Sequence, residues 1–104
     1  MKKILITGAS GGIGSAIANK FSMHNFSLIL TSSSNDKLDL LKEKYGKSNF
    51  YYLLDFNAPI LFEETLKKIS EEHKDLDVIV NNAGITDDSL ILRMKNEQWN
   101  KVIN

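Results

Sequence analysis

The sequence contains no cysteine, so it has neither disulfide bonds nor thiolate metal ligands. Its two histidines, His24 and His73, are isolated in the sequence, and neither a second histidine nor a cluster of carboxylates lies near His24. Metal sites built from histidine and carboxylate need several such ligands at suitable spacing. We therefore expect no metal site, and we interpret His24 as a solvated residue at the end of a helix.

Long apolar runs are also missing. No segment approaches the roughly 18 apolar residues of a membrane-spanning helix, and Met1-Lys2-Lys3 leads into the first predicted strand without the apolar core of a signal peptide. Thirteen basic and thirteen acidic residues cancel, so bulk charge favours neither nucleic acid nor an anionic membrane as a partner. We expect a cytoplasmic protein that handles small molecules, organised as one globular unit of 104 residues.

Glycine, in contrast, is concentrated in one place. Four of the six glycines lie between residues 8 and 14, directly after the apolar run 4–6 and before a helical pattern over 15–23. This succession predicts a buried strand, a tight turn and a helix. Glycines at 8, 12 and 14 remove side chains where the chain turns, where phosphates approach the backbone and where helix packs on strand. The helix N-terminus offers N–H groups and a positive dipole end to a pyrophosphate.

The rest of the chain alternates between strand and helix patterns. Apolar spacing in the first helix predicts a buried stripe of Ile13, Ala16, Ile17 and Phe21, with Ala16 and Ala18 allowing close approach to the sheet. Further strands are predicted over 27–31, 49–56 and 76–80. Leu38, Leu41 and Tyr45 form the stripe of a second helix that Gly46 ends, and Phe62, Leu66 and Ile69 form that of a third helix starting at Pro59. This alternation predicts an α/β fold with a parallel sheet.

The C-terminal quarter has a less regular pattern. Residues 85–95 show a less regular connection, and Asn96 is placed to cap a last helix that holds Trp99, Val102 and Ile103. The sequence ends on the apolar stripe of this helix, without a glycine, a proline or a polar tail, so it looks cut. We expect it to be the N-terminal nucleotide-binding portion, residues 1–104, of a single domain.

Two motifs together carry a family resemblance. A glycine-rich turn alone is weak evidence, because many such turns are only flexible connections. Here the turn Thr7-Gly-x-x-x-Gly-x-Gly14 and the segment Asn81-Asn-Ala-Gly84 occur together, and the chain resembles the classical short-chain dehydrogenase/reductase family over its whole length. Within that family, the run 81–103 looks most like the 3-oxoacyl-[acyl-carrier-protein] reductases. Its most specific part is Ile-Thr-x-Asp-x-Leu-x-x-Arg-Met-Lys, residues 85–95.

The resemblance implies a Rossmann-type parallel sheet with strand order 3-2-1-4 and flanking helices, truncated before the fifth strand. The turn, Asp55 and residues 82–84 should then lie at one edge of the sheet. Without a fifth strand, the fourth strand should keep an exposed edge, so that the 104-residue chain is marginally folded and self-associates. The complete protein is expected to be a homo-oligomer, as members of the family are.

The resemblance also assigns site residues. The turn that cradles the pyrophosphate and contacts the adenosine ribose matches Gly8, Ala9, Ser10, Gly11, Gly12, Ile13 and Gly14. Asp55 matches the acid that accepts a hydrogen bond from the adenine amino group, and Phe56 contributes a backbone N–H beside it. Asn82, Ala83 and Gly84 match the segment near the nicotinamide half. The alternatives are that Asp55 is a turn or capping acid and that Asn81 and Asn82 only tie the strand end to its neighbours.

Cofactor choice depends on the end of the second strand. An acid there would hydrogen-bond the ribose 2′-hydroxyl of NAD and repel a 2′-phosphate. Ser32 and Ser33 stand there instead, and their hydroxyls are suited to donate to a 2′-phosphate. The basic residue that many NADP enzymes place at Ser33 or at Gly11 is missing. The absence of a carboxylate favours NADP over NAD.

No catalytic residue is identified. The family uses a tyrosine four residues before a lysine, with a serine upstream, but Tyr45, Tyr51 and Tyr52 are followed at that distance by residues other than lysine. One interpretation is a cofactor-binding fragment of an NADP-dependent reductase that converts 3-oxoacyl-acyl-carrier-protein to the 3-hydroxyacyl form in fatty acid synthesis. The alternative is a free-standing or decayed nucleotide-binding protein without catalytic activity. Under the first, the isolated chain should bind NADP weakly and reduce nothing.

Overall fold

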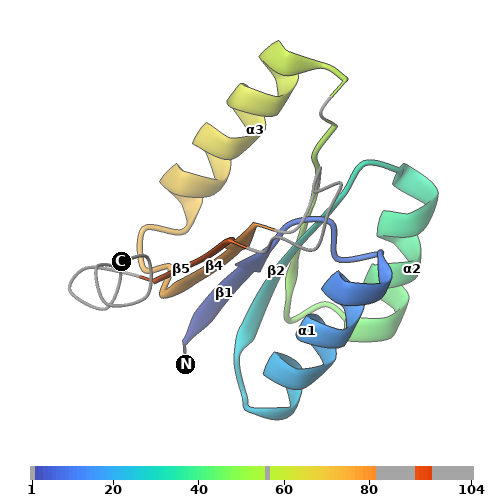
Figure 1. The fold of residues 1–104 in the computed structure, drawn as a ribbon, viewed down its shortest axis with the longest axis vertical. Helices are drawn as coiled ribbons and strands as arrows, with labels where there is room; N and C mark the ends of the chain where they lie inside the picture. The colour runs from blue at the N-terminus through green and yellow to red at the C-terminus, as the bar shows by residue number, and fades with distance from the viewer. Residues whose placement is uncertain (1, 56, 82–90, 95–104) are drawn as a thin grey trace.

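The computed structural model describes residues 2–55, 57–81 and 91–94. Strands and helices alternate through most of this range (Figure 1). Their bounds are β1 (Lys3–Ile6), α1 (Gly12–Met23), β2 (Ser27–Ser32), α2 (Asn35–Tyr45), β3 (Phe50–Leu53), α3 (Pro59–Glu72), β4 (Val78–Asn81) and β5 (Ile91–Met94). The first seven elements were all predicted from the sequence, and their ends differ from the prediction by a few residues.

The sheet has the order β3-β2-β1-β4-β5. The first four strands run parallel, so the predicted order 3-2-1-4 is confirmed. In the register, Ile4 of β1 lies between Leu28 of β2 and Val78 of β4. A parallel strand that is buried on both faces usually has a continuous run of apolar residues. All six residues of β2 are buried.

The fifth strand corrects the prediction for residues 85–95. Residues 91–94 of this expected irregular connection form β5, which pairs antiparallel with β4. The edge of β4 is therefore covered, and the expected open edge, a premise of the self-association prediction, is wrong. A parallel crossover takes a dozen or more residues, whereas fewer than a dozen separate Asn81 from Ile91. A strand returning over so short a connection pairs antiparallel.

The helices α1 and α2 cover one face of the sheet (Figure 1). Because side chains alternate along a strand, every second residue of β1, β2 and β4 points to this face. Together with Ala18, Leu38 and Leu41 of the helices they form the larger core cluster. The strand members of that cluster are Ile4, Ile6, Leu28, Leu30, Val78 and Val80, and each is at most 5% exposed.

The buried stripe of α1 differs from the predicted one. Gly14 and Ala18 are buried, Ile17 and Phe21 are half-buried, and Ile13 is 55% exposed. Ala16 is also exposed, so its expected place in the stripe was wrong. The helix starts at Gly12, and its closest approach to the sheet runs along positions 14, 18 and 21, where the first two residues are small.

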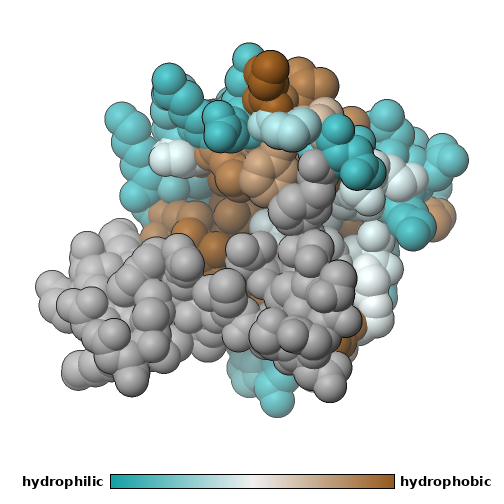
Figure 2. Space-filling view, turned by 45° about the horizontal axis from the view of Figure 1, so that its top comes forward, coloured by the Kyte–Doolittle hydropathy of each residue, from teal (hydrophilic) through white to brown (hydrophobic). Residues whose placement is uncertain are grey.

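The opposite face is covered by α3 and is less completely packed. Its core cluster contains Leu5, Ile29 and Ile69, and Ile69 is the only buried residue of α3. The other predicted stripe residues, Phe62 and Leu66, are half-buried. At the start of the helix, Ile60 and Leu61 are 75% and 63% exposed. Figure 2 shows such apolar surface, in brown, among hydrophilic residues on the described part of the molecule.

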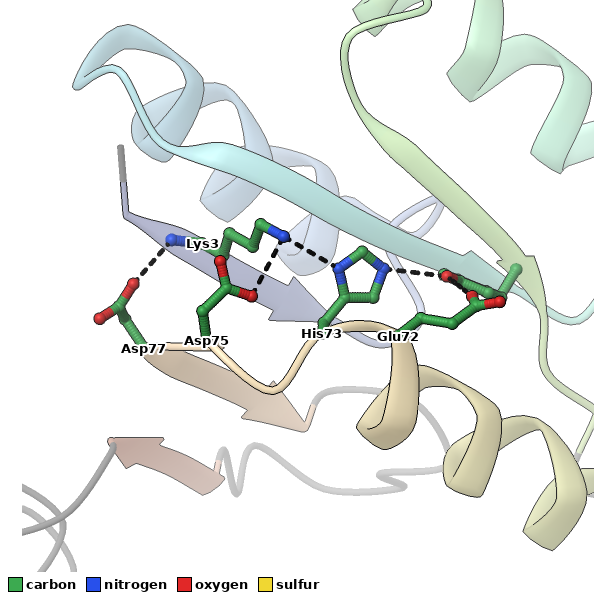
Figure 3. A network of polar contacts seen from close by, with 6 residues as sticks. Lys3, Glu72, His73, Asp75 and Asp77 are labelled. Carbon is green, nitrogen blue, oxygen red and sulfur yellow. Dashed lines mark hydrogen bonds and ion pairs between the residues drawn. The ribbon is translucent and has the colours of Figure 1, made fainter.

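Polar contacts at the end of α3 tie it to the sheet (Figure 3). The Lys3 ammonium lies 3.3 Å from Nδ1 of His73 and 3.1 Å from Oδ1 of Asp75. The Tyr52 hydroxyl lies 2.9 Å from Nε2 of His73 and donates to Glu72. An ammonium group has no lone pair, so Nδ1 of His73 accepts and Nε2–H donates to Tyr52. The chain of hydrogen bonds thus requires a neutral imidazole.

The protonation equilibria of this network follow from its burial. His73 is only 4% exposed, and burial followed by the nearby charge of Lys3 lowers its pKa below 6.5. Burial, and then the hydrogen bond to and charge of Glu72, raise the pKa of the Tyr52 hydroxyl. The hydrogen bond from Lys3 lowers the pKa of Asp75. Perturbed groups often mark functional sites, but this network lies under the end of α3, between Lys3 of β1 and Tyr52 of β3, and it contains no residue of the glycine turn.

Candidate functional site

The carboxyl ends of the parallel strands meet at one edge of the sheet (Figure 1). The glycine turn follows β1, Ser33 follows β2 and Asp55 follows β3, so these predicted site residues share this edge. In open α/β sheets, ligands bind at this edge where the strand order reverses, which here is between β1 and β4. The predicted residues Phe56, Asn82, Ala83 and Gly84 lie outside the described residues.

The turn after β1 is anchored on β2 by Thr31. Gly8 has a φ of 64°, a conformation in which glycine is favoured, and its N–H donates to Oγ1 of Thr31 at 3.3 Å. The N–H of Ala9 donates to the Thr31 carbonyl at 2.9 Å, and the Ala9 side chain is fully buried. Ala9 therefore supports the turn from inside and offers no side-chain contact to a ligand. Thr31 was predicted only as a strand residue; a hydroxyl within an aliphatic strand was the available signal.

The first turn of α1 is open to an anionic ligand. No described side chain caps the helix, and its first turn contains no acid. The first N–H groups of a helix have no partner within the helix, so those of Gly12, Ile13 and Gly14 point out of its end. A Cβ atom at Gly12 would meet nothing within 4 Å among the described residues. Free N–H groups at a helix N-terminus beside open space are the surroundings in which proteins commonly bind phosphate groups.

The two serines at the end of β2 are not equivalent. Ser32 is 1% exposed, and its Oγ lies 3.1 Å from Oγ of Ser10 and accepts the Ser34 N–H at 3.3 Å. Ser33 is exposed. The expectation that both hydroxyls are available to a 2′-phosphate is therefore corrected, because the hydroxyl of Ser32 is used inside the protein. Ser33 keeps its predicted place at the surface of this edge.

Asp55 is half-buried at the start of the connection to α3. Its Oδ1 accepts the Asn57 N–H at 2.9 Å, and its carbonyl accepts the Ala58 N–H at 3.2 Å. One carboxylate oxygen thus forms the local turn that was the alternative interpretation of this residue. A carboxylate has a second oxygen, so the turn and a contact to adenine are compatible.

Within residues 2–55, 57–81 and 91–94, no three histidine, cysteine, aspartate or glutamate side chains gather closely enough to hold a metal ion. Among the same residues, no helix is both long and apolar enough to cross a membrane. Every buried side-chain nitrogen or oxygen there has a hydrogen-bond partner. The edge with the glycine turn is therefore our candidate site.

Comparison with known proteins identifies relatives of the chain. The profile of the family described as short chain dehydrogenase matches residues 2–104. The chain is 39% identical over 102 residues to the 3-oxoacyl-[acyl-carrier-protein] reductase FabG of Escherichia coli (strain K12), covering 98% of this chain and 42% of that protein. It is 40% identical over 103 residues to the enzyme of the same name from Vibrio harveyi, with 99% and 42% covered. The chain thus spans less than half the length of these relatives.

Solved structures agree with the sequence relatives. A short-chain dehydrogenase from Streptomyces avermitilis superposes with a TM-score of 0.68 and 31% identity, over 80% of this chain and 30% of that one. The strand order, the glycine turn at the carboxyl edge and these similarities point to one conclusion. The chain belongs to the short-chain dehydrogenase family.

Proposed function

We propose that this chain forms the dinucleotide-binding part of an NADP-dependent reductase whose complete form acts on 3-oxoacyl-acyl-carrier-protein. The observation that carries the proposal is the uncapped start of α1, with open space at Gly12. The substrate is inferred from the names of relatives that are 39% and 40% identical. A cytoplasmic location and assembly into a homo-oligomer stay predictions for the complete protein.

The proposed contacts follow the order of the site along the sheet edge. The N–H groups at the start of α1 hold the pyrophosphate, and Ser10 and Gly11 lie beside the adenosine ribose. Asp55 accepts from the adenine amino group with the oxygen that its turn does not use, and Phe56 adds its N–H. Asn82, Ala83 and Gly84 belong to the nicotinamide half. Bound NADPH supplies the hydride, while this chain's residues bind and orient the dinucleotide.

NADP is preferred over NAD for an electrostatic reason. At the end of β2, Ser32 is buried and Ser33 is exposed, and neither carries a charge that opposes a 2′-phosphate. An acid at this place would accept from the 2′-hydroxyl of NAD and repel the phosphate of NADP. The Ser33 hydroxyl is suited to donate to a phosphate oxygen.

One observation favours the second candidate, a nucleotide-binding protein without catalysis. None of the three tyrosines is followed four residues later by a lysine, so the family's acid/base pair is not in this sequence. The coding DNA after codon 104 distinguishes the two. A continuation with a serine and a Tyr-x-x-x-Lys in any reading frame supports the reductase, whereas its absence favours the binding protein.

The binding proposal is tested by Gly12→Val. A Cβ atom at position 12 would have no described atom of another part of the chain within 4 Å, so the melting temperature should hardly change, but the side chain would occupy the proposed place of the phosphates. Calorimetric titration with NADP should show at least about a tenfold loss of affinity, since a bound phosphate loses several hydrogen bonds of about 1 kcal/mol each.

The matched control is Gly46→Ala. Gly46 ends α2 with a φ of 81°, so a side chain there strains the backbone, yet the residue precedes β3 and so lies toward the amino ends of the parallel strands, away from the turn. This variant should melt earlier and keep the NADP affinity of its folded fraction. Equal affinities of Gly12→Val and the unaltered chain would overturn the proposal.

A further inference from the structure

The buried hydroxyl of Ser32 connects two parts of the candidate site that are distant in sequence. Ser32 is the last residue of β2 and is 1% exposed. Its Oγ lies 3.1 Å from Oγ of Ser10, 22 residues earlier in the glycine turn. It also accepts the N–H of Ser34, the N-cap residue of α2, at 3.3 Å. One side chain therefore touches both the turn after β1 and the loop after β2.

A buried hydroxyl lowers the stability of the fold unless it is hydrogen-bonded, because burial removes the hydrogen bonds that it makes to water in the unfolded chain. Ser32 meets this requirement with two hydrogen bonds. Its Oγ accepts from the Ser34 N–H, and the same hydroxyl also forms a hydrogen bond with the hydroxyl of Ser10. Its main chain is used as well, since its carbonyl accepts the Leu54 N–H from the end of β3 at 2.9 Å. Ser32 is thus held in place independently of any ligand.

The other anchors of the turn differ in kind. The N–H groups of Gly8 and Ala9 bond to Thr31, so they hold the backbone of the turn near its start. The pair of Ser10 with Ser32 is the contact that positions an exposed side chain of the turn. Ser33, which follows Ser32 directly, is exposed at the same edge. The Ser32 hydroxyl therefore sets the position of Ser10 relative to the loop that contains Ser33.

On these contacts we propose that Ser32 is a positioning residue for recognition of the cofactor's 2′-phosphate, which it never touches. The inference rests on the proposed function, because it assumes that the adenosine ribose lies between Ser10 and Ser33. Ser32 keeps the two exposed serines in a preformed arrangement, so no ordering is needed when the phosphate binds. Preorganisation of this kind increases affinity by reducing the entropic cost of binding.

The test compares two nucleotides that carry only the adenosine half of the cofactor. Adenosine 2′,5′-bisphosphate contains the 2′-phosphate, and adenosine 5′-monophosphate lacks it. Dissociation constants are measured by titration monitored by NMR for the 104-residue chain and for Ser32→Ala, Ser10→Ala and the double variant. Ser32→Ala should weaken binding of the bisphosphate about fivefold and binding of the monophosphate less than twofold. In the Ser10→Ala background, removal of the Ser32 hydroxyl should weaken binding of the bisphosphate less than half as much.

Controls separate positioning from general loss of structure. Ser22→Ala removes an exposed hydroxyl from α1 away from the site, and it should change neither constant. If Ser32→Ala folds poorly, Ser10→Ala removes the same contact from the exposed side, and its selective effect on the bisphosphate supports the inference. Equal loss for both nucleotides, or additive losses in the double variant, would overturn it. Failure of the unaltered chain to bind either nucleotide would overturn the proposed function and this inference together.

Discussion

The helices α1 and α2 hold one face of the sheet through mainly aliphatic contacts, whereas α3 holds the other through one buried isoleucine and a chain of polar groups (Figures 1 and 3). Both helical layers follow from the same alternation of strands and helices. The first face depends on the hydrophobic effect, which is not directional and changes little with pH. The second also depends on a defined protonation state of His73 and on the geometry of its partners.

The network on the α3 face fills a place where apolar packing ends. The His73 ring lies edge-on to Phe50, with ring centres 4.5 Å apart, and the Lys3 ammonium lies 5.2 Å from the centre of the Phe50 ring. These contacts join β1, β3 and the end of α3, which are far apart in sequence. A buried polar network is stabilising only while all its members are satisfied. The two faces should therefore respond differently to substitution and to pH.

The largest difference is expected on truncating leucines of the two helical layers. Leu41→Ala in α2 should lower the free energy of unfolding by about 3 kcal/mol, because Leu41 is 5% exposed in the larger core. Leu66→Ala in α3 should cost about 1 kcal/mol, since this side chain is only half-buried. Urea unfolding measures both, with the exposed Leu40→Ala as the matched control. Equal losses of unfolding free energy in Leu41→Ala and Leu66→Ala would contradict the difference between the two helical layers.

A second difference is expected in the pH dependence of stability. The pKa of His73 in the folded chain is lowered, so below about pH 6.5 the unfolded chain takes up a proton that the folded chain does not. The groups around the imidazole are Lys3, Tyr52, Glu72 and Asp75. The His73 contribution is present above about pH 6.5 and is lost as pH falls, by at most about 1.4 kcal/mol per pH unit.

The matched variants for this prediction are His73→Phe and His24→Gln. Phenylalanine keeps the ring against Phe50 but has no proton to gain, so the slope between about pH 5 and 7 should become shallower than in the unaltered chain. His24→Gln replaces an exposed histidine at the end of α1, outside the network, and is the control for removing a histidine. The slope is measured by urea unfolding at a series of pH values. An unchanged slope in His73→Phe would show that the network does not couple α3 to pH.

The smallest effect is expected at Asp75. Its carboxylate pairs with Lys3 at 3.1 Å, but 65% of its side chain is exposed, so water and salt screen the pair. Asp75→Asn should leave the urea midpoint unchanged within experimental error, although the hydrogen bond lowers the pKa of this group. A clear loss of stability that salt does not reduce would mean that the exposed end of the network contributes as much as its buried end.

Much of the candidate site was predictable because its signals are local. Gly8 has the positive φ that its place after β1 suggested, and Asp55 lies at the same edge as the turn, as predicted. The inequality of Ser32 and Ser33 was not predictable, because it depends on which side of the strand end faces the turn. Thr31 was missed as an anchor for the same reason. Successive side chains of a strand point to opposite sides, so of two neighbouring serines one hydroxyl is buried and the other is exposed.

By itself, the sequence determined the order of strands and helices, the parallel sheet, the glycine turn and the end of α2 at Gly46, because each depends on spacing or backbone freedom within a few residues. Tertiary structure alone decided the rest. The rotation of α1, the antiparallel pairing of β5 and the link from His73 to Lys3, 70 residues apart, depend on packing and strand register. No local pattern contains the position of a partner so far along the chain, so these contacts exist only in the folded molecule.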